Sequence, residues 1–271
     1  MTTQAPEPPA AEEVEAKEIP NIKLYIVAVI TGIIGYYILL ANPNLAFISV
    51  ILAWPAIVAG AGGVEHLCRY GLGTGTSSIG YWGTAVGATV VFATIFMSSQ
   101  IFDLYSPFIV IIVGTIIGYV VGLCAERIIK MKIPEQAQQS FIITGSSAIF
   151  ILIVLEVLSS GGVAATKLYY TFPVIYIGTA LVILHPYNGS LGAGENQKRT
   201  LLLAWCEASL ITTLFGIIGL LLPNTTSFIP ALGMLVISLI GFAVFVRIWW
   251  KKVKEDTYEI VWTGYPAGVP H

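Results

Sequence analysis

Acidic side chains inside apolar stretches are the residues of this sequence that could do chemistry. Glu207 is the clearest of them, because it lies about seven residues inside the apolar stretch 200–222, or ~10 Å along a helix. A carboxylate is costly in a bilayer and normally faces a bundle interior or water, which makes it a candidate for an ion pathway. The alternative is a protonated Glu207 that hydrogen-bonds to a neighbouring helix and has only a structural role.

Two further carboxylates lie toward the other side of the predicted membrane domain. Glu156 is near the end of the stretch 141–158, and Asp103 lies between the stretches 79–98 and 106–125. Together they would make an outer vestibule negative and attractive to cations. The alternative is that both are ordinary solvated carboxylates at the membrane edge. The sequence identifies no individual ligand of a cation.

Motifs for covalent chemistry do not occur in this chain. The three cysteines have no metal-ligand spacing, and there is no Ser/His/Asp set or pair of glycosidase carboxylates. The charge pattern also lacks the broad basic field of a nucleic-acid-binding protein. We therefore expect no catalytic site, no directly bound cofactor and no nucleic-acid partner.

The elements that position these residues must be membrane helices. Of the 271 residues, 56% are hydrophobic and only 10% are charged, which excludes an ordinary soluble enzyme. A helix needs about 20 apolar residues to cross a bilayer, and about eight stretches qualify, so the fold class is an all-α, polytopic membrane bundle. The predicted spans are 22–41, 45–67, 79–98, 106–125, 141–158, 168–184, 200–222 and 227–246. Pro186 is expected to end the sixth span at His185.

The distribution of Lys and Arg predicts the orientation. With eight spans, twelve of the thirteen basic residues fall on one side, and only Lys167 falls on the other. Cytoplasmic loops retain Lys and Arg, so both termini are predicted to lie in the cytoplasm of a multi-pass plasma-membrane protein, in contact with membrane lipid.

Three regions follow from this pattern. Residues 1–20 form an acidic cytoplasmic tail that we expect to be disordered, residues 21–250 form the membrane domain, and residues 251–271 form a cytoplasmic C-terminal segment. The tail holds five glutamates against one lysine, a formal charge of −4. Its charge serves solubility or contacts a basic partner.

Two predicted cytoplasmic loops share the pattern H-x5-L-G-x-G at an offset of 119 residues, starting at His66 and at His185. An offset of four spans preserves membrane orientation, so the pattern suggests two parallel four-helix halves; the alternative is a chance resemblance of glycine-rich loops. Neither loop fits a nucleotide-binding fingerprint, and docking of a partner is the preferred interpretation. The docking candidates are Gly71, Gly73, Gly75, Arg69, Gly192, Gly194, Lys198 and Arg199.

Smaller patterns predict local contacts. Arg69 follows Glu65 at the i,i+4 spacing of a helical ion pair. Gly114, Gly118 and Gly122 recur every four residues and predict a face on which helix backbones approach closely. Gly83 and Gly87 predict the same on the preceding span.

The two glycine-rich segments also carry a resemblance. The segment 70–80, YGLGTGTSSIG, and the segment 185–201, from HPYN through LG to QKRTL, resemble the C subunit of the membrane-bound tetrahydromethanopterin S-methyltransferase of methanogenic archaea. The resemblance covers the chain from the first predicted span to the eighth.

This resemblance implies a role within a multisubunit complex. The family's complex transfers a methyl group from methyl-tetrahydromethanopterin, through a corrinoid on another subunit, to coenzyme M, and couples this step to Na⁺ export. The C subunit would pack with the related D and E membrane subunits and help to form the Na⁺ pathway, while the methyl chemistry takes place elsewhere. The alternative function is a self-contained, cation-coupled secondary transporter.

Overall fold

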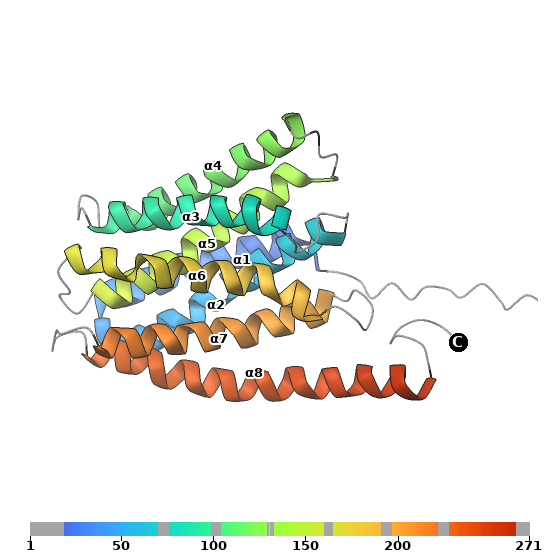
Figure 1. Ribbon diagram of the computed structural model, residues 1–271. Helices are drawn as coiled ribbons and strands as arrows, with labels where there is room; N and C mark the ends of the chain where they lie inside the picture. The colour runs from blue at the N-terminus through green and yellow to red at the C-terminus, as the bar shows by residue number, and fades with distance from the viewer. Residues whose placement is uncertain are drawn as a thin grey trace, which may run out of the picture.

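The computed structural model describes residues 19–69, 76–98, 104–128, 130, 133–159, 165–190, 197–221 and 228–263. Most of these residues are helical, and the eight α-helices that they form lie side by side in one elongated bundle (Figure 1). They are α1 (Asn21–Ala41), α2 (Ala46–Leu67), α3 (Thr76–Ser98), α4 (Ser106–Arg127), α5 (Gln136–Ser159), α6 (Ala165–Ser190), α7 (Gln197–Leu221) and α8 (Phe228–Thr263); a short 3₁₀ turn, η1 (Pro43–Leu45), joins α1 to α2. The predicted all-α membrane bundle is confirmed.

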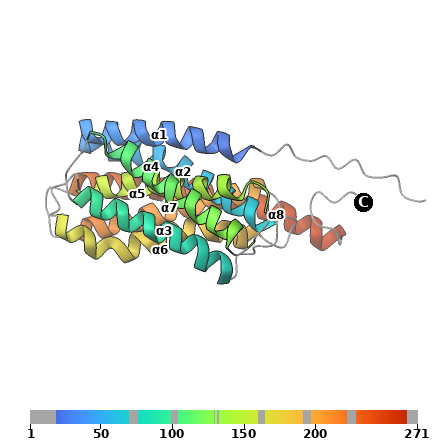
Figure 2. The ribbon, with the colours of Figure 1, turned by 90° about the horizontal axis from the view of Figure 1, so that it is seen from above.

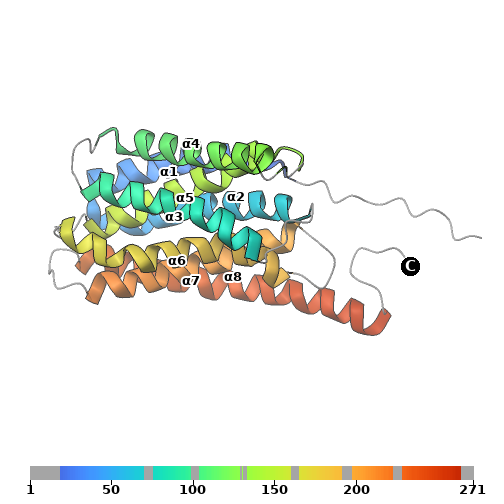
Figure 3. The same cartoon turned by 45° about the horizontal axis from the view of Figure 1, so that its top comes forward.

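Six of these helices are long and apolar enough to cross a membrane: α1, α2 together with η1, α4, α5, α7 and the first part of α8. Helix α3 adds a shorter apolar stretch over Tyr81–Met97. Helix α6 lies between α3 and α7 in the same bundle (Figure 3). The structure therefore supports a multi-pass membrane protein, and the count of eight spans stays a prediction.

Helix α5 forms the centre of the bundle. In its most apolar 18-residue window 89% of the residues are buried, against 33% in α1 and α4 and 22% in α8. It contacts α1, α2, α3, α4 and α6 (Figure 2). The exposed side chains of the peripheral helices are themselves large and apolar, for example Ile116 on α4 and Ile240 on α8, as expected for surfaces that face lipid.

The predicted glycine stripe on α4 is a close helix contact. Gly114, Gly118 and Gly122 are all buried, and they face Ala148, Thr144, Ser140 and Ala137 of α5. A Cβ atom placed on Gly122 would lie 2.9 Å from the Cα of Ala137, so only glycine permits this approach. On α3, the corresponding Cβ of Gly87 would lie 3.0 Å from the ring of Tyr176 on α6.

One end of the bundle, called the inner end below, is where α1, α3, α5 and α7 begin and where α2, α4, α6 and α8 end. It corresponds to the side predicted to be cytoplasmic. Both described chain ends are located there, at the right of Figure 1. Asn21 connects helices at this end, since its Nδ2 donates to the Gly62 carbonyl on α2 at 3.0 Å and to Oε1 of Gln139 on α5 at 3.1 Å.

One predicted helix end was wrong. Helix α6 does not stop at His185 but continues to Ser190 with Pro173 and Pro186 inside it, because membrane helices tolerate the loss of a backbone hydrogen bond at proline when neighbours satisfy the freed group. Helix α8 runs to Thr263, beyond the limit of the predicted span at Val246. The first part of the predicted C-terminal segment therefore prolongs α8 beyond the other helices (Figure 1).

Candidate ion-pathway site

Glu207 lies in the inner half of α7, with its side chain inside the bundle. Helix α7 begins at Gln197, so Glu207 is ten residues along it, or ~15 Å at 1.5 Å per residue. Its side chain is only 12% exposed. This low exposure agrees with the expectation that the Glu207 carboxylate cannot easily reach water.

The partner of Glu207 is His185 on α6. Nδ1 of His185 and Oε1 of Glu207 lie 2.5 Å apart. An ionised carboxylate can only accept hydrogen bonds, so Nδ1 donates in that state, and a protonated imidazole would complete an ion pair. The two side chains connect α6 to α7 across a sequence separation of 22 residues.

The second carboxylate oxygen of Glu207 is in a different situation. Oε2 is buried and has no hydrogen-bond partner among the described residues. The nearest hydroxyl groups in sequence donate elsewhere, because Ser209 bonds to the carbonyl of Cys206 at 2.7 Å and Thr212 to that of Ala208 at 2.8 Å. Glu207 thus presents one satisfied oxygen and one available oxygen.

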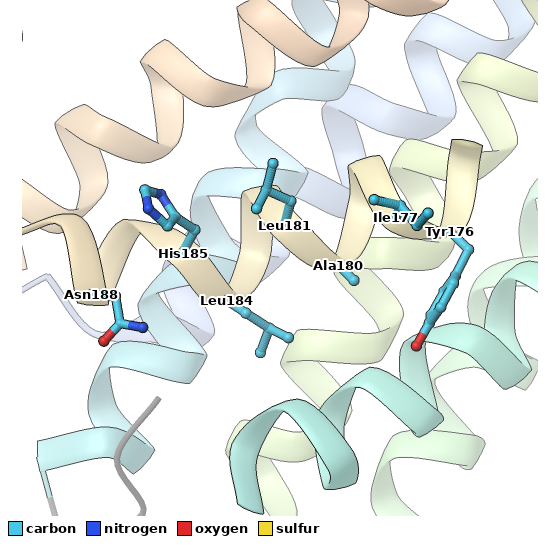
Figure 4. Close-up of a pocket in the computed structure, with 7 residues that line it drawn as sticks. All are labelled: Tyr176, Ile177, Ala180, Leu181, Leu184, His185 and Asn188. Carbon is cyan, nitrogen blue, oxygen red and sulfur yellow. The ribbon is translucent and has the colours of Figure 1, made fainter. Parts of the chain in front are cut away.

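His185 also borders a groove on the surface of α6. The groove has a volume of about 270 Å³ and a mainly apolar wall, with His185 and Asn188 toward one end and Tyr176 at the other (Figure 4). The His185 side chain is 49% exposed. His185 therefore contacts the buried carboxylate through Nδ1 and is also one of the residues that line the groove.

The structure does not bring Glu156 to this site. Glu156 is twenty residues along α5 from the inner end and Glu207 ten residues along α7, which separates them by ~15 Å along the bundle. Glu156 is partly buried near the outer end. Asp103 lies outside the described residues, so the outer vestibule stays a prediction.

The docking candidates divide into three groups. Gly71, Gly73, Gly75, Gly192 and Gly194 lie outside the described residues, and with them the two loops that suggested a repeat. Arg69 forms the predicted ion pair with Glu65, whose side chain is 2% exposed. Lys198 is exposed at the inner end, whereas Arg199 is buried at 4% exposure.

His185 is the residue that sequence reasoning missed. Its place before Pro186 predicts the start of a loop and not a position inside a helix. The available signal was that a histidine and a glutamate occur in adjacent predicted spans near the same side, which permits a pair across an antiparallel helix contact. The pairing itself required the register between α6 and α7.

Comparison with known proteins adds to this geometry. Residues 8–268 match the family model described as the C subunit of tetrahydromethanopterin S-methyltransferase. The proteins of that name from Methanothermobacter thermautotrophicus and Methanopyrus kandleri are 29% and 30% identical to this chain, over 91% and 93% of its length and 92% of theirs. The one from Methanosarcina barkeri is 30% identical over 90% of this chain and 91% of its own.

The family match covers the whole described bundle, including the helices that carry His185 and Glu207. The helical architecture and the multi-pass composition agree with the resemblance seen in the two loop segments. This chain belongs to the family of the tetrahydromethanopterin S-methyltransferase C subunit.

Proposed function

We propose that this chain is a non-catalytic membrane subunit that helps to form the Na⁺ pathway of its methyltransferase complex. Family membership makes it a subunit of a methyltransferase with other subunits as partners. The Na⁺ pathway, the transfer of the methyl group to coenzyme M and the corrinoid on a neighbouring subunit are parts of the proposal. The related D and E membrane subunits are the proposed neighbours within the bilayer of the plasma membrane.

One observation carries the proposal: Glu207 lies ~15 Å along α7 with Oε2 buried and available, while Oε1 is hydrogen-bonded to His185. Na⁺ is a hard cation that prefers oxygen ligands, and a carboxylate next to a helix contact is a suitable stopping point. A protonated His185 would compete with the cation for the carboxylate, so Na⁺ entry and release of the His185 hydrogen bond are linked in this arrangement.

The proposal includes an orientation. The inner end carries the exposed bases Lys23, Lys130 and Lys198, and we assign it to the cytoplasm because cytoplasmic segments retain Lys and Arg. The soluble, methyl-transferring subunits would then dock at this end. Na⁺ would pass Glu207 on its way to the outer end, where Glu156 lies.

The test is Glu207→Gln in the complete complex, reconstituted in vesicles and driven by methyl-tetrahydromethanopterin and coenzyme M. We expect the Na⁺ moved per methyl group to fall at least about tenfold, because an amide replaces a charged ligand, while all subunits still co-purify. Glu255→Gln is the matched control, since Glu255 on α8 is 56% exposed and should behave as the unmodified complex. An unchanged ratio of Na⁺ to methyl groups in Glu207→Gln would remove Glu207 from the pathway.

A separate experiment tests the assignment to a complex. Liposomes that contain this chain alone should show no Na⁺-dependent solute uptake. Such uptake would support a self-contained secondary transporter instead, as would purification of the native chain without any methyltransferase subunit.

A further inference from the structure

One face of α8 changes from apolar to basic along its length. Positions three, four or seven residues apart return to nearly the same side of a helix with 3.6 residues per turn. On one such line Val236 is 48% exposed and Ile240 is 55% exposed, and the exposed bases Arg247, Lys251 and Lys254 follow toward the inner end. These residues, called the α8 stripe below, cover ~27 Å of the helix.

The basic part of the α8 stripe lies at the level of lipid headgroups. Helix α8 begins at Phe228 at the outer end of the bundle, and Arg247 and Lys254 lie ~29 Å and ~39 Å further along it. The hydrocarbon core of a bilayer is about 30 Å thick, and the headgroup layers bring the total to about 40–45 Å. An upright α8 therefore places the apolar part of the stripe among acyl chains and its bases in the headgroup layer of the inner end.

The described part of the chain leaves the α8 stripe uncovered. Helix α8 packs mainly on α7 and lies along the edge of the bundle (Figure 1, Figure 2). The exposure of the five side chains shows that none of the described helices covers them. The stripe therefore faces lipid or a neighbouring molecule.

The bases of the α8 stripe keep their positive charge largely uncompensated. Nζ of Lys251 lies 3.9 Å from Oε1 of Glu255, but both side chains are more than half exposed, so this ion pair is weak. Nζ of Lys254 lies 5.6 Å from the centroid of the Trp250 ring, a contact that does not neutralise the charge. Arg247 has no ion-pair partner among the described residues. An anion at this level would meet three cations on one face.

The acidic residues of this part of α8 lie off the stripe. Glu255, Asp256 and Glu259 are at about 100°, 200° and 140° around the helix from Lys254. Trp250 is only about 40° from Lys254 and is 52% exposed, and tryptophan is enriched where a membrane meets water. The stripe thus combines an apolar path, an interfacial aromatic ring and a cluster of cations.

We propose that the α8 stripe binds one anionic phospholipid of the leaflet at the inner end. Its phosphate lies between Arg247 and Lys251, because a guanidinium can bind phosphate through two hydrogen bonds and Lys251 is on the next turn. One acyl chain lies along Ile240 and Val236. An acidic protein surface would match only the bases, whereas a lipid joins a negative headgroup to an apolar chain as the stripe requires. This inference is independent of Na⁺ conduction and goes beyond the proposed function.

The experiment is photo-crosslinking of the intact complex in detergent with phosphatidylglycerol that carries a diazirine on an acyl chain, followed by mass spectrometry of the digested complex. We expect label on the α8 peptide that contains Ile240. An excess of unlabelled phosphatidylglycerol should compete for this label at least about tenfold better than the same excess of phosphatidylcholine, because three bases attract the net negative headgroup. Inorganic phosphate should not compete, because it lacks the acyl chain.

Three outcomes would overturn the proposal. Equal competition by phosphatidylcholine would reduce the site to a contact with acyl chains. Competition by inorganic phosphate alone would make it a site for a soluble anion. Label on other segments of the complex with none on α8 would show that a neighbouring subunit covers the stripe.

A combined variant with Arg247, Lys251 and Lys254 all changed to Gln tests the bases directly. The label on α8 should fall at least about tenfold, because the three charges are lost. The matched control removes the same charge from other exposed positions of the inner end and should keep the label; it carries Lys23→Gln, Arg127→Gln and Lys130→Gln. An equal loss of label in both variants, or no loss in the α8 variant, would contradict the proposal.

A conservative variant separates binding from folding. Lys251→Arg together with Lys254→Arg retains both charges and should retain the label. The thermal midpoint and the subunit content should be the same in all variants, since the changed side chains are exposed. None of these readouts depends on Na⁺ transport, so the lipid site and the proposed Na⁺ pathway stand or fall separately.

Discussion

At the scale of single residues, the proposed ion pathway depends on the contact between His185 and Glu207. A buried carboxylate needs hydrogen bonds or an opposite charge to offset the loss of water, and the 2.5 Å contact with Nδ1 supplies this to Oε1 only. The remaining oxygen, Oε2, has no such compensation among the described residues. A second hydrogen-bond donor at Oε2 would make the folded protein more stable. An oxygen without such a donor is better suited to bind a ligand transiently.

The first residue-scale prediction concerns His185→Ala. Removal of the imidazole leaves Glu207 in the bundle without its hydrogen bond, which should lower the stability of the α6–α7 contact by about 1–3 kcal/mol. We expect a lower thermal midpoint of the purified complex and a reduced ratio of Na⁺ to methyl groups, with a smaller effect on that ratio than in Glu207→Gln because the carboxylate remains.

Asn188→Ala is the matched control for this change. Asn188 borders the same groove as His185 and is exposed, but no described hydrogen bond connects it to Glu207. The control should retain the thermal midpoint and the Na⁺ ratio. Identical behaviour of the two variants would show that the contact between His185 and Glu207 matters to neither quantity.

At the scale of secondary-structure elements, the α4–α5 contact shows how small residues direct packing in a membrane. Lipid and protein interior are both apolar, so close van der Waals contact and not hydrophobicity favours one helix neighbour over another. Gly114, Gly118 and Gly122 bring α4 onto the backbone of the central helix α5. The other face of α4, with Ile116 at 54% exposure, is available to lipid.

This contact predicts the effect of Gly118→Leu. A side chain at this position would meet the hydroxyl of Thr144 and the backbone of Ser140, and overpacking of this kind typically costs about 1–3 kcal/mol. We expect a lower thermal midpoint and partial loss of subunits on purification. Ile116→Leu, on the exposed face of the same helix, should have no measurable effect, and equal midpoints of the two variants would contradict the close α4–α5 contact.

The ends of α6 and α8 show what the sequence does not reveal about where helices end. Proline removes one hydrogen-bond donor and therefore predicts an end of α6 at His185, yet the helix passes through Pro186 to Ser190. In α8 the change from apolar to charged residues limits the predicted span to Val246, and the helix continues to Thr263, because Lys and Glu are good helix formers. Hydropathy marks where a membrane ends, and a helix does not have to end there.

At the scale of the whole molecule, the bundle places the described chain ends at the same end (Figure 1). The two ends of the bundle therefore differ. Lys130 and Lys198 lie at the inner end, whereas Leu104, which is 57% exposed, lies before α4 at the outer end. This arrangement fixes which residues share a compartment. Which compartment the inner end faces is inferred from the distribution of basic residues.

Cysteine labelling tests this polarity in intact cells. A membrane-impermeant maleimide should label Leu104→Cys from the outside and should not label Lys198→Cys until the membrane is permeabilised, because the positively charged end stays in the cytoplasm. The parent chain measures the background, because Cys68 and Cys206 are buried and Cys124 is only partly buried. Labelling of Lys198→Cys from outside would reverse the assigned orientation and the proposed direction of docking.

The sequence by itself determined the class of this protein, the approximate positions of its helices and the presence of one deep carboxylate. It could do so because a long apolar stretch has few physical solutions other than a membrane helix, and because a charge inside such a stretch is conspicuous. It also predicted the pair of Glu65 with Arg69 and the glycine face of α4. Both depend only on spacing within one helix.

Only the tertiary structure decided which helices are neighbours. Lipid and the bundle interior are equally apolar, so the sequence carries little information about which face of a membrane helix is buried, and nothing in its pattern distinguishes the central α5 from the peripheral α8. The pair of His185 with Glu207 and two hydrogen bonds between Gln197 and Ile19 join residues 22 and 178 positions apart. Such contacts depend on the register between helices, which is set by packing in three dimensions.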